Sequence, residues 1–405
     1  MCVSFKLSGR TIHPDPRPQE NLKRRQFCTK YQQFPSFCSG DLIDNPLVPN
    51  PSIKFTNSKI FTTPVIVMSG EVIHHLPLTL ETLIMQPGID PRHVLVFHVP
   101  EHPEVRDLCE LFGFTAEQMD NSNLAKSCDQ FTEAFDTAER QFLDAVHFVV
   151  IEEGVILAPD FLAYLAQLLP LLDLDSTISS ISAWNDNGFD GVSGKSRRVY
   201  RVESLTGLAF LVRRGFPAQG WCERRFEQRP EGSPSGGDSL SPDASRVVEA
   251  SSEVFESLMA RGRVTDMQLG VTLEDIDKLE RSRYERLLHD LLSTSLTWAL
   301  NPEYLATCNV RTRLPLPPAS AATERHAVSL YFDQNSPDDI ESLRSLCSCF
   351  GLFHHPKFYP RGLYRGMLRF TWEDYDVFLI GRYSPYYKFK PKNISPLSLE
   401  RAVSG

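Results

Sequence analysis

The stretch from Ala145 to Leu162 reads AVHFVVIEEGVILAPDFL, and it decides the fold class. Its first seven residues form an apolar run rich in β-branched and aromatic side chains, which predicts a fully buried strand. Glu152, Glu153 and Gly154 follow this run directly. Such a strand is typical of the centre of a parallel α/β sheet, where ligands bind at the carboxyl ends of the strands. We therefore expect the functional residues just after Ile151.

The residues before this stretch alternate between strand-like and helix-like patterns. Short apolar runs occur at 61–68 (FTTPVIVM) and 93–98 (HVLVFH), and helix-periodic segments occur at 76–85, 103–112 and 123–142. Strands that alternate with helices across short turns indicate one large parallel sheet. The predicted fold class is thus α/β, with a doubly wound, mostly parallel sheet.

The residues after this stretch contain a second pattern. Strand-like runs at 327–332 and 377–380 flank a helical segment at 340–350, which predicts a smaller C-terminal α/β lobe. Residues 273–298 are charged and helix-periodic, and Arg281, Arg283 and Arg286 are most simply a solvated face.

Three parts follow from these patterns. Residues 1–60 are rich in Pro, Asn and Ser and are expected to form an extended N-terminal lead-in. Residues 61–270 are expected to form the main domain, and 271–405 the C-terminal helix with the small lobe. The segment 232–241, GSPSGGDSLS, predicts a flexible loop or short linker.

The composition excludes several classes of protein. A hydrophobic share of 41% and a charged share of 23% are ordinary for a soluble globular protein. The formal net charge of -9 would repel a polyanion, so nucleic acid is excluded as the main partner. No run of 18 apolar residues occurs, and residues 1–18 lack the apolar run of a signal peptide, so we expect any membrane anchor to lie outside this sequence.

Nine cysteines are too few for a disulfide scaffold, and no CxxC pair indicates zinc. Cys28 and Cys38 flank a short loop in a segment of low apolar content, where a disulfide would stabilise most. The alternative is two free, partly buried thiols. The histidine pairs His74–His75 and His354–His355 lack a spaced third ligand, which favours surface or structural roles over metal binding.

Two segments together resemble a known family. VVIEEGVILAPDFL (149–162) and ISAWNDNG (181–188) are similar to the N-acetylglucosaminyltransferase I family, in which a strand ends in three acids and a SAWNDNG loop follows. The resemblance is closest to the protein O-linked-mannose β-1,2-N-acetylglucosaminyltransferases. It extends to RRQFCTKYQQFPSFCS (24–39), VYRVESLTGLAFLVRR (199–214) and RGLYRGMLRFTWEDYDVFLIGRYSPY (361–386).

This resemblance implies a function. It implies a nucleotide-sugar transferase domain of GT-A type at 61–270 that moves N-acetylglucosamine from UDP-GlcNAc to a mannose hydroxyl, with inversion. Manganese would be the cofactor and an O-mannosylated glycoprotein the acceptor. The expected location is the Golgi lumen, with an anchor outside this chain. The sequon Asn393-Ile394-Ser395 agrees with a lumenal location.

The resemblance also assigns donor and metal positions. Glu152 and Glu153 match the first two acids of the family triplet, which hold the ribose and the donor sugar. The third acid, the metal ligand, is replaced by Gly154, which has no side chain to coordinate a cation. We therefore predict no protein ligand for the metal at this position.

The base is displaced as well. The family segment that carries the catalytic aspartate aligns with WCERRFEQRPE (221–231), and the aspartate falls at Arg224. Glu223 and Glu227 are the candidate bases beside it. A guanidinium stays protonated across the usable pH range, so Arg224 itself cannot accept a proton.

On the acceptor side, Trp184, Asn185 and Asp186 match the family loop and are the candidate acceptor-binding residues. The alternative for Trp184 is an ordinary core aromatic, and for Asp186 a turn residue. Further departures weaken the donor site. The family's Gly-Asn-Arg-Pro reads SGEV at 69–72, and its uracil-reading aspartate is matched by Val99 or Pro100.

Two functions stay open at this point. The first is a β-1,2-N-acetylglucosaminyltransferase. The second is a catalytically impaired relative, a pseudoenzyme, that binds a glycan or a partner glycosyltransferase through the retained loop at 184–188.

Overall fold

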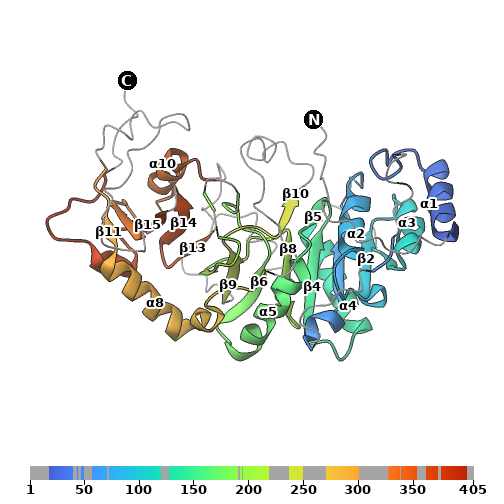
Figure 1. The fold of residues 1–405 in the computed structure, drawn as a ribbon, viewed down its shortest axis with the longest axis horizontal. Coiled ribbons are helices and arrows are strands. Elements are labelled where there is room, and N and C mark those ends of the chain that lie inside the picture. Colours follow the sequence, from blue (N-terminus) through green and yellow to red (C-terminus); the bar gives the residue numbers. More distant parts are fainter. Residues whose placement is uncertain are drawn as a thin grey trace, which may run out of the picture.

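The computed structural model describes residues 18–39, 43, 47–49, 57–70, 73–119, 127–189, 192–193, 195–218, 237–249, 271–300, 327–337, 339–353, 362–372 and 375–398. The strands of the first sheet are β1 (Val65–Met68), β2 (Val94–His98), β3 (Thr115–Gln118), β4 (His147–Glu152), β6 (Ile178–Ser182), β7 (Val199–Val202), β8 (Ala209–Arg213) and β9 (Asp238–Pro242). They are ordered β3-β2-β1-β4-β8-β6-β9-β7. Figure 1 labels β2, β4, β8, β6 and β9, which follow one another in this direction across the sheet. A separate two-stranded ribbon pairs β5 (Val155–Leu157) with β10 (Val247–Glu249).

Most strands of this sheet are parallel. β1 to β4 pair with one another in parallel, as do β6 and β9. β8 runs antiparallel between β4 and β6, and β7 runs antiparallel beside β9. The predicted fold class, a mostly parallel α/β sheet with β4 near its centre, is confirmed.

Helices cover both faces of the sheet, which makes it doubly wound. One face carries α2 (Leu76–Ile84), α3 (Glu104–Phe112) and α5 (Phe161–Leu174), whose apolar side chains share a core with Val67, Val96 and Ile151. The other face carries α4 (Ser127–Gln141), which packs on Phe97 and Val150. Because both faces are buried, strands such as β4 are continuously apolar rather than alternating.

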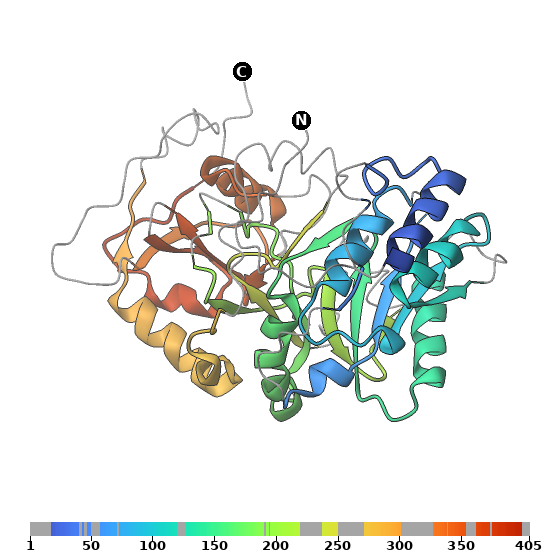
Figure 2. The same cartoon turned by 45° about the vertical axis from the view of Figure 1, so that its right-hand side comes forward.

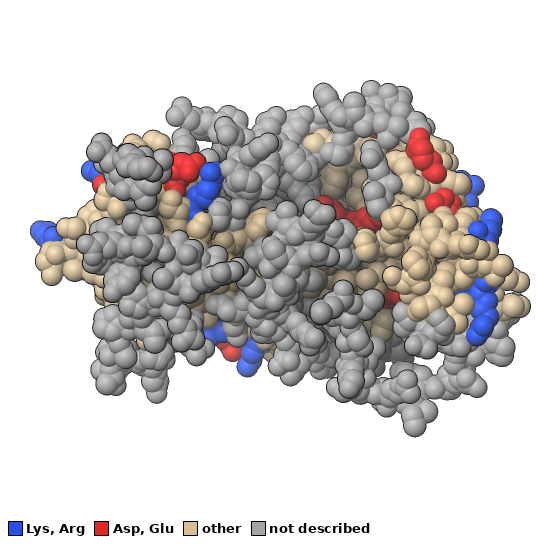
Figure 3. All heavy atoms as spheres, turned by 90° about the horizontal axis from the view of Figure 1, so that it is seen from above, with Lys and Arg blue, Asp and Glu red and all other residues tan. Residues whose placement is uncertain are grey.

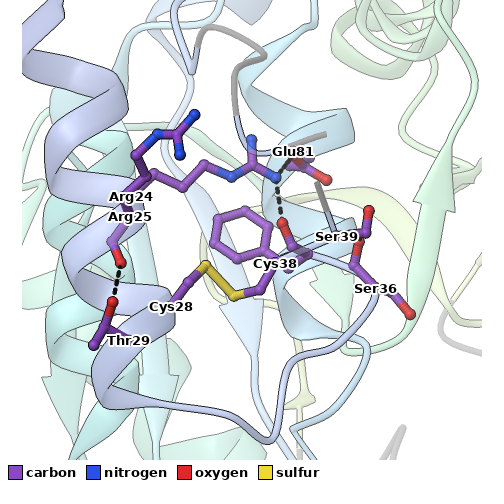
Figure 4. Close-up of a disulfide and its surroundings, with 9 residues drawn as sticks. Arg24, Arg25, Cys28, Thr29, Ser36, Cys38, Ser39 and Glu81 are labelled. Carbon is purple, nitrogen blue, oxygen red and sulfur yellow. Dashed lines mark hydrogen bonds and ion pairs between the residues drawn. A yellow bond between two sulfur atoms is a disulfide. The ribbon is translucent and has the colours of Figure 1, made fainter. Parts of the chain in front are cut away.

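The N-terminal segment differs from the expected extended lead-in. Residues 18–30 form helix α1, which lies against α3 (Figure 2). Arg24, only 1% exposed, donates to Phe37 O at 2.7 Å and to Glu81 Oε1 at 2.8 Å (Figure 4). The segment is too polar for its helix to be recognised from hydrophobic periodicity, because tertiary docking supplies much of the stability of such a helix.

A disulfide closes this segment. Cys28 and Cys38 are bonded, so the disulfide alternative is confirmed over two free thiols (Figure 4). Cys128 and Cys349 each take part in a disulfide as well. Cys109 and Cys347 are free and buried.

The predicted linker at 232–241 is wrong for its last residues. Residues 238–242 form β9, which lies between β6 and β7 in the first sheet. Its serines are buried but hydrogen-bonded: Ser241 Oγ donates to Trp184 O at 3.2 Å and Ser239 Oγ to Ser180 O at 3.4 Å. The Gly- and Ser-rich composition concealed a strand whose polar side chains find partners inside the protein.

The C-terminal lobe has the predicted α/β character. Its elements are β11 (Leu296–Thr297), β12 (Ala327–Phe332), β13 (Leu363–Tyr364), β14 (Met367–Trp372) and β15 (Tyr375–Gly381), with helices α8 (Arg281–Thr294) and α10 (Ile340–Phe350). The sheet order is β11-β12-β15-β14-β13, so a hairpin, β13–β14, adds to the predicted strand-helix-strand unit. The three arginines of α8 are exposed, as predicted.

Apolar side chains join the two sheets. Tyr331, Phe378 and Ile380 of the second sheet belong to the same core as Ile151 of the first. The other face of the second sheet has its own core around Val328. The domain boundaries at residues 60 and 270 stay predictions. Within the described ranges, no helix has the length and apolar character needed to cross a membrane.

Candidate active site at the carboxyl edge of the first sheet

The carboxyl ends of β1, β2 and β4 lie side by side. Met68 of β1 pairs with Phe97 on one side and with Glu152 on the other. The ladder continues for one more residue, because Ser69 N–H donates to Phe97 O at 2.9 Å. Glu153 N–H likewise donates to Met68 O at 2.9 Å. The two predicted donor-binding acids therefore lie at the sheet edge where ligands of such folds bind.

Glu152 is tied to the loop that enters β8. Its backbone N–H donates to Leu208 O at 2.8 Å, and its Oε1 accepts from Leu208 N–H at 2.9 Å. Leu208 has a φ of 64°, a left-handed conformation that non-glycine residues adopt only when the surroundings impose it. Part of the acceptor capacity of Glu152 thus holds this loop.

Glu153 faces the turn after β1 instead. Its Oε2 accepts from Gly70 N–H, and its Oε1 is buried without a partner. Burial raises the pKa of Glu153 to about 7, against the smaller lowering effects of Gly70 N–H, His102 and the Ser69 hydroxyl. Burial therefore disfavours the charged form of this carboxyl group. Groups with such shifted pKa values cluster at functional sites.

Replacing Glu153 with Gln is expected to stabilise the fold at pH 8 and to have little effect at pH 5. Its pKa of about 7 in the folded protein exceeds its ordinary value of 4.5, so the native state holds a proton that the unfolded state has released. Stability therefore falls as pH rises through 7. The gain in unfolding free energy at pH 8 is bounded by about 3 kcal/mol. Urea titrations at both pH values test this, and equal stability of parent and variant at pH 8 would contradict it.

Gly154 occupies the position where the resemblance places the metal ligand. Its φ is 75°, in the left-handed region that glycine adopts freely. Across the described residues, no three His, Cys, Asp or Glu side chains gather where they could hold a metal ion. At the position where the resemblance places the metal-binding carboxylate, Gly154 therefore offers manganese no side-chain ligand.

Ser69 and His98 are two buried polar residues at this edge. Neither is among the candidate ligand-binding residues predicted from the sequence. They are 3% and 1% exposed, and Ser69 Oγ and His98 Nε2 have no hydrogen-bond partner. HVLVFH places a histidine at the end of an apolar strand, but a lone histidine there carries no signal of its own. His74 contacts Gln33 O through Nδ1, and the pair His354–His355 lies outside the described residues.

The predicted acceptor residues lie in a buried loop after β6. Trp184 Nε1 donates to Asp186 Oδ1 at 2.7 Å, and the two residues are 7% and 5% exposed. Asn185 Nδ2 donates to Pro242 O at 2.9 Å. These bonds give all three side chains a structural role in holding the loop, and their binding of an acceptor stays a prediction.

Close packing explains the rest of the SAWNDNG motif. A Cβ on Gly188 would lie 2.3 Å from Ser245 Oγ and 2.7 Å from Ser245 N, so only glycine fits. Asn187 Oδ1 accepts from Phe353 N–H at 2.8 Å, which links the loop to the C-terminal lobe.

The neighbouring segment at 242–246 is also held by buried polar contacts. Tyr200 OH donates to Asp243 Oδ1 at 2.7 Å, and Arg246 pairs with Asp160 at 2.9 Å. These contacts fix the turn between β9 and β10. This segment in turn holds the loop at Trp184, because Asn185 N–H donates to Ser245 Oγ at 3.0 Å.

The predicted bases cannot be located. Glu223 and Glu227 lie outside the described residues, as do Arg224 and Glu71.

Figure 3, which views the molecule from above, shows acidic side chains set back in a hollow on that face. The site that the structure brings together is therefore the edge formed by Ser69, His98 and Glu153, with Glu152 beside it.

The segment that contains this edge matches a known protein family. Residues 60–223 match the GNT-I family. The match runs from the 3-10 turn η1 (Lys59–Thr62) past the end of β8, and it includes both acids and the loop at Trp184. It leaves β9, β10 and the second sheet outside. The GNT-I match supports a glycosyltransferase, with a sugar-nucleotide donor and a glycan acceptor.

Solved structures with some likeness in fold include two enzymes, each 10% identical to this chain. One is 4-diphosphocytidyl-2C-methyl-D-erythritol synthase, with a TM-score of 0.30 over 49% of this chain and 97% of that chain. The other is glucosyl-3-phosphoglycerate synthase from Mycobacterium tuberculosis in complex with Mg2+ and UDP, with a TM-score of 0.28 over 54% and 86%. Likeness at this level supports no inference about function.

Proposed function

We propose that this chain binds UDP-GlcNAc at the carboxyl edge of the first sheet and transfers N-acetylglucosamine to a mannose hydroxyl, with inversion, far more slowly than an ordinary enzyme. The observation that carries the proposal is the pair Glu152–Glu153 at the end of a central strand, within the segment that matches the GNT-I family. The acceptor we propose is an O-mannosylated glycoprotein.

The chain's own groups have two tasks in this reaction. Carboxylate oxygens of Glu152 and Glu153 accept hydrogen bonds from hydroxyl groups of the donor and so orient it. In transfer, the acceptor oxygen bonds to the anomeric carbon as the bond to UDP breaks, and a carboxylate takes the hydroxyl proton. We assign that last task to Glu223 or Glu227, by resemblance. Manganese would supply charge neutralisation in the family, but Gly154 offers it no side-chain ligand in this chain.

A second candidate function is favoured by Gly154. Without a carboxylate at this position and with Arg224 in place of the base, the chain could serve as a non-catalytic relative that binds a glycan or a partner glycosyltransferase. The surface that we assign to such binding is the loop at 184–188. The two candidates share the fold and differ in turnover.

We place the protein in the Golgi lumen. The disulfide between Cys28 and Cys38, together with the bonded Cys128 and Cys349, supports an oxidising compartment. Asn393 of the glycosylation sequon is exposed, which is compatible with modification there.

Calorimetry of UDP-GlcNAc on the purified chain, with and without manganese, tests the proposal. If Glu152 and Glu153 hold the donor and Gly154 cannot bind the metal, binding should be measurable and should depend little on manganese. The absence of any binding would exclude the donor role, and a strong manganese requirement would show that a metal ligand exists that the described residues do not supply.

Replacing Gly154 with Asp is expected to make UDP-GlcNAc binding depend on manganese, with a gain of about tenfold or more in affinity when the metal is present. The left-handed φ of 75° strains any side chain by about 1 kcal/mol, but Asp and Asn tolerate it best. Gly154→Asn is therefore the matched control, with equal strain and no charge. Equal affinities for the Asp and Asn variants would mean that position 154 does not face the phosphates.

A further inference from the structure

Three buried polar atoms without partners lie at the ends of adjacent strands. They are Ser69 Oγ, His98 Nε2 and Glu153 Oε1. Ser69 and His98 are almost fully buried, at 3% and 1% exposed. Native proteins rarely leave buried polar atoms unpaired, and three of them at the ligand-binding edge of a parallel sheet indicate a place that a ligand completes.

The register of the sheet sets these residues in one row. Met68 is paired with Phe97 on β2 and with Glu152 on β4. Ser69 and Glu153 each follow the last residue of their strand, and the bonds from Ser69 N–H to Phe97 O and from Glu153 N–H to Met68 O continue the ladder there, so Ser69 lies between His98 and Glu153. Side chains at one level of neighbouring strands share a face of the sheet. That face is the one on which Val67, Val96 and Ile151, two residues earlier on each strand, join a single core.

The hydrogen-bonding character of each atom follows from its neighbours. His98 Nδ1 lies 2.9 Å from Val99 O, so Nδ1 carries the hydrogen, and in the neutral imidazole Nε2 then presents a lone pair. Glu153 Oε2 accepts from Gly70 N–H, so Oε1 is the free oxygen of this carboxyl group, and it is an acceptor once the group has ionised, above a pKa of about 7. Ser69 Oγ has no hydrogen bond of ordinary geometry, although its hydroxyl is close enough to the Glu153 carboxyl group to lower the pKa of that group through a weak hydrogen bond, and it can still donate or accept.

This character selects the ligand group. Once the Glu153 carboxyl group has ionised, two acceptors, at His98 and Glu153, flank a hydroxyl, so the ligand must bring at least two donors. A phosphate brings only acceptors. In the described part of the chain, the groups that act on the Glu153 carboxyl are a backbone N–H, a hydroxyl and His102, with no Lys or Arg among them. A pair of neighbouring sugar hydroxyls supplies two donors and carries no charge.

We propose that Ser69, His98 and Glu153 form a hydroxyl-recognition row that binds the vicinal hydroxyl pair of a ribose or pyranose, with His98 Nε2 as a specificity-determining acceptor. This proposal rests on the proposed function, in which the same edge binds a sugar nucleotide. It assigns His98 a role in ligand recognition, and it implies that the phosphates of the nucleotide do not contact the row. Ribose and pyranose share the required chemistry, and the experiment distinguishes them.

The experiment measures affinities of UDP and 2′,3′-dideoxy-UDP by calorimetry for the parent chain, His98→Phe and His98→Gln. Phe keeps the ring volume without an acceptor, and Gln restores a polar atom near the position of Nε2. His289→Phe is the control, because His289 is an exposed histidine on α8, outside the site. Methyl α-D-mannoside and N-acetylglucosamine are the pyranose probes.

We expect the parent chain to prefer UDP over its dideoxy form by at least about tenfold, the worth of one or two hydrogen bonds. His98→Phe should weaken UDP binding about tenfold, leave dideoxy-UDP unchanged, and be partly corrected by His98→Gln. In the parent chain, the long-range 1H–15N signal of His98 Nε2 should shift on adding UDP, a readout that needs no variant.

The outcomes separate the two proposals. One outcome is that UDP binds, that His98→Phe lowers the affinity for UDP and dideoxy-UDP equally or for neither, and that the Nε2 signal does not shift. This outcome would overturn the hydroxyl-recognition row and leave donor binding in place. If UDP does not bind and a pyranose probe binds in a His98-dependent way, the row stands and the donor assignment fails. If no probe binds the parent chain, both are overturned.

Discussion

Transfer of N-acetylglucosamine from UDP-GlcNAc to an O-mannosyl peptide is expected to be undetectable, or at least about 10²-fold below the ordinary enzyme range of about 1 to 10³ per second. Two defects combine. Gly154 leaves the diphosphate leaving group without a metal-binding carboxylate, and Arg224 stands where the resemblance calls for the catalytic aspartate. A guanidinium cannot take the proton of the mannose hydroxyl, and loss of a general base typically lowers the rate 10² to 10⁴-fold.

The double variant Gly154→Asp with Arg224→Asp should increase the rate, measured as labelled disaccharide released from the peptide. Its matched control is the same pair changed to Asn, which alters size and backbone strain equally but supplies neither a metal ligand nor a base. Turnover of about 1 per second or more by the parent chain would show that the inference of impairment is mistaken.

Replacing Arg201 with Met is expected to lower the free energy of unfolding by about 3 to 5 kcal/mol. The Arg201 side chain is fully buried between two aspartates, 2.8 Å from Asp175 Oδ2 and 2.6 Å from Asp238 Oδ2. It also donates to Leu279 O at 2.8 Å, and so connects β7, β9 and the turn before α8. Removing the guanidinium leaves two acids facing each other without a cation.

Urea titration measures this loss. Arg197→Met is the control, because Arg197 is 53% exposed and pairs with an exposed Glu274, so its removal should change stability by at most about 1 kcal/mol. A conservative change, Arg201→Lys, should fall between the two, because lysine keeps the charge but cannot reproduce the forked contacts. A loss under about 1 kcal/mol for Arg201→Met would contradict the assigned role.

The sequence predicted the elements whose signal is local. AVHFVVI is apolar enough to identify β4 as a buried central strand, and the acids after Ile151 lie at the predicted edge. The helices α2 and α3 follow their apolar periodicity. In each case the residues that determine the element are the ones that it contains, so inspection of a short window suffices.

The sequence did not predict features that depend on distant partners. The serines of β9 look like a linker until Ser180 and Trp184 supply hydrogen-bond acceptors from elsewhere in the chain. Helix α1 is polar and is held through contacts such as Arg24 with Glu81. His98 could be recognised only once the register placed it beside Ser69 and Glu153, because a lone histidine in an apolar run carries no signal of its own.

A crystal structure of the chain with UDP-GlcNAc would show whether the donor binds at the carboxyl edge of the first sheet, through carboxylate acceptors and without a metal ligand at Gly154. We expect density for the nucleotide sugar over the ends of β1, β2 and β4, with hydroxyl groups within hydrogen-bond distance of Glu153 and His98. Density in another part of the molecule, or a manganese ion held by protein side chains beside the diphosphate, would contradict it.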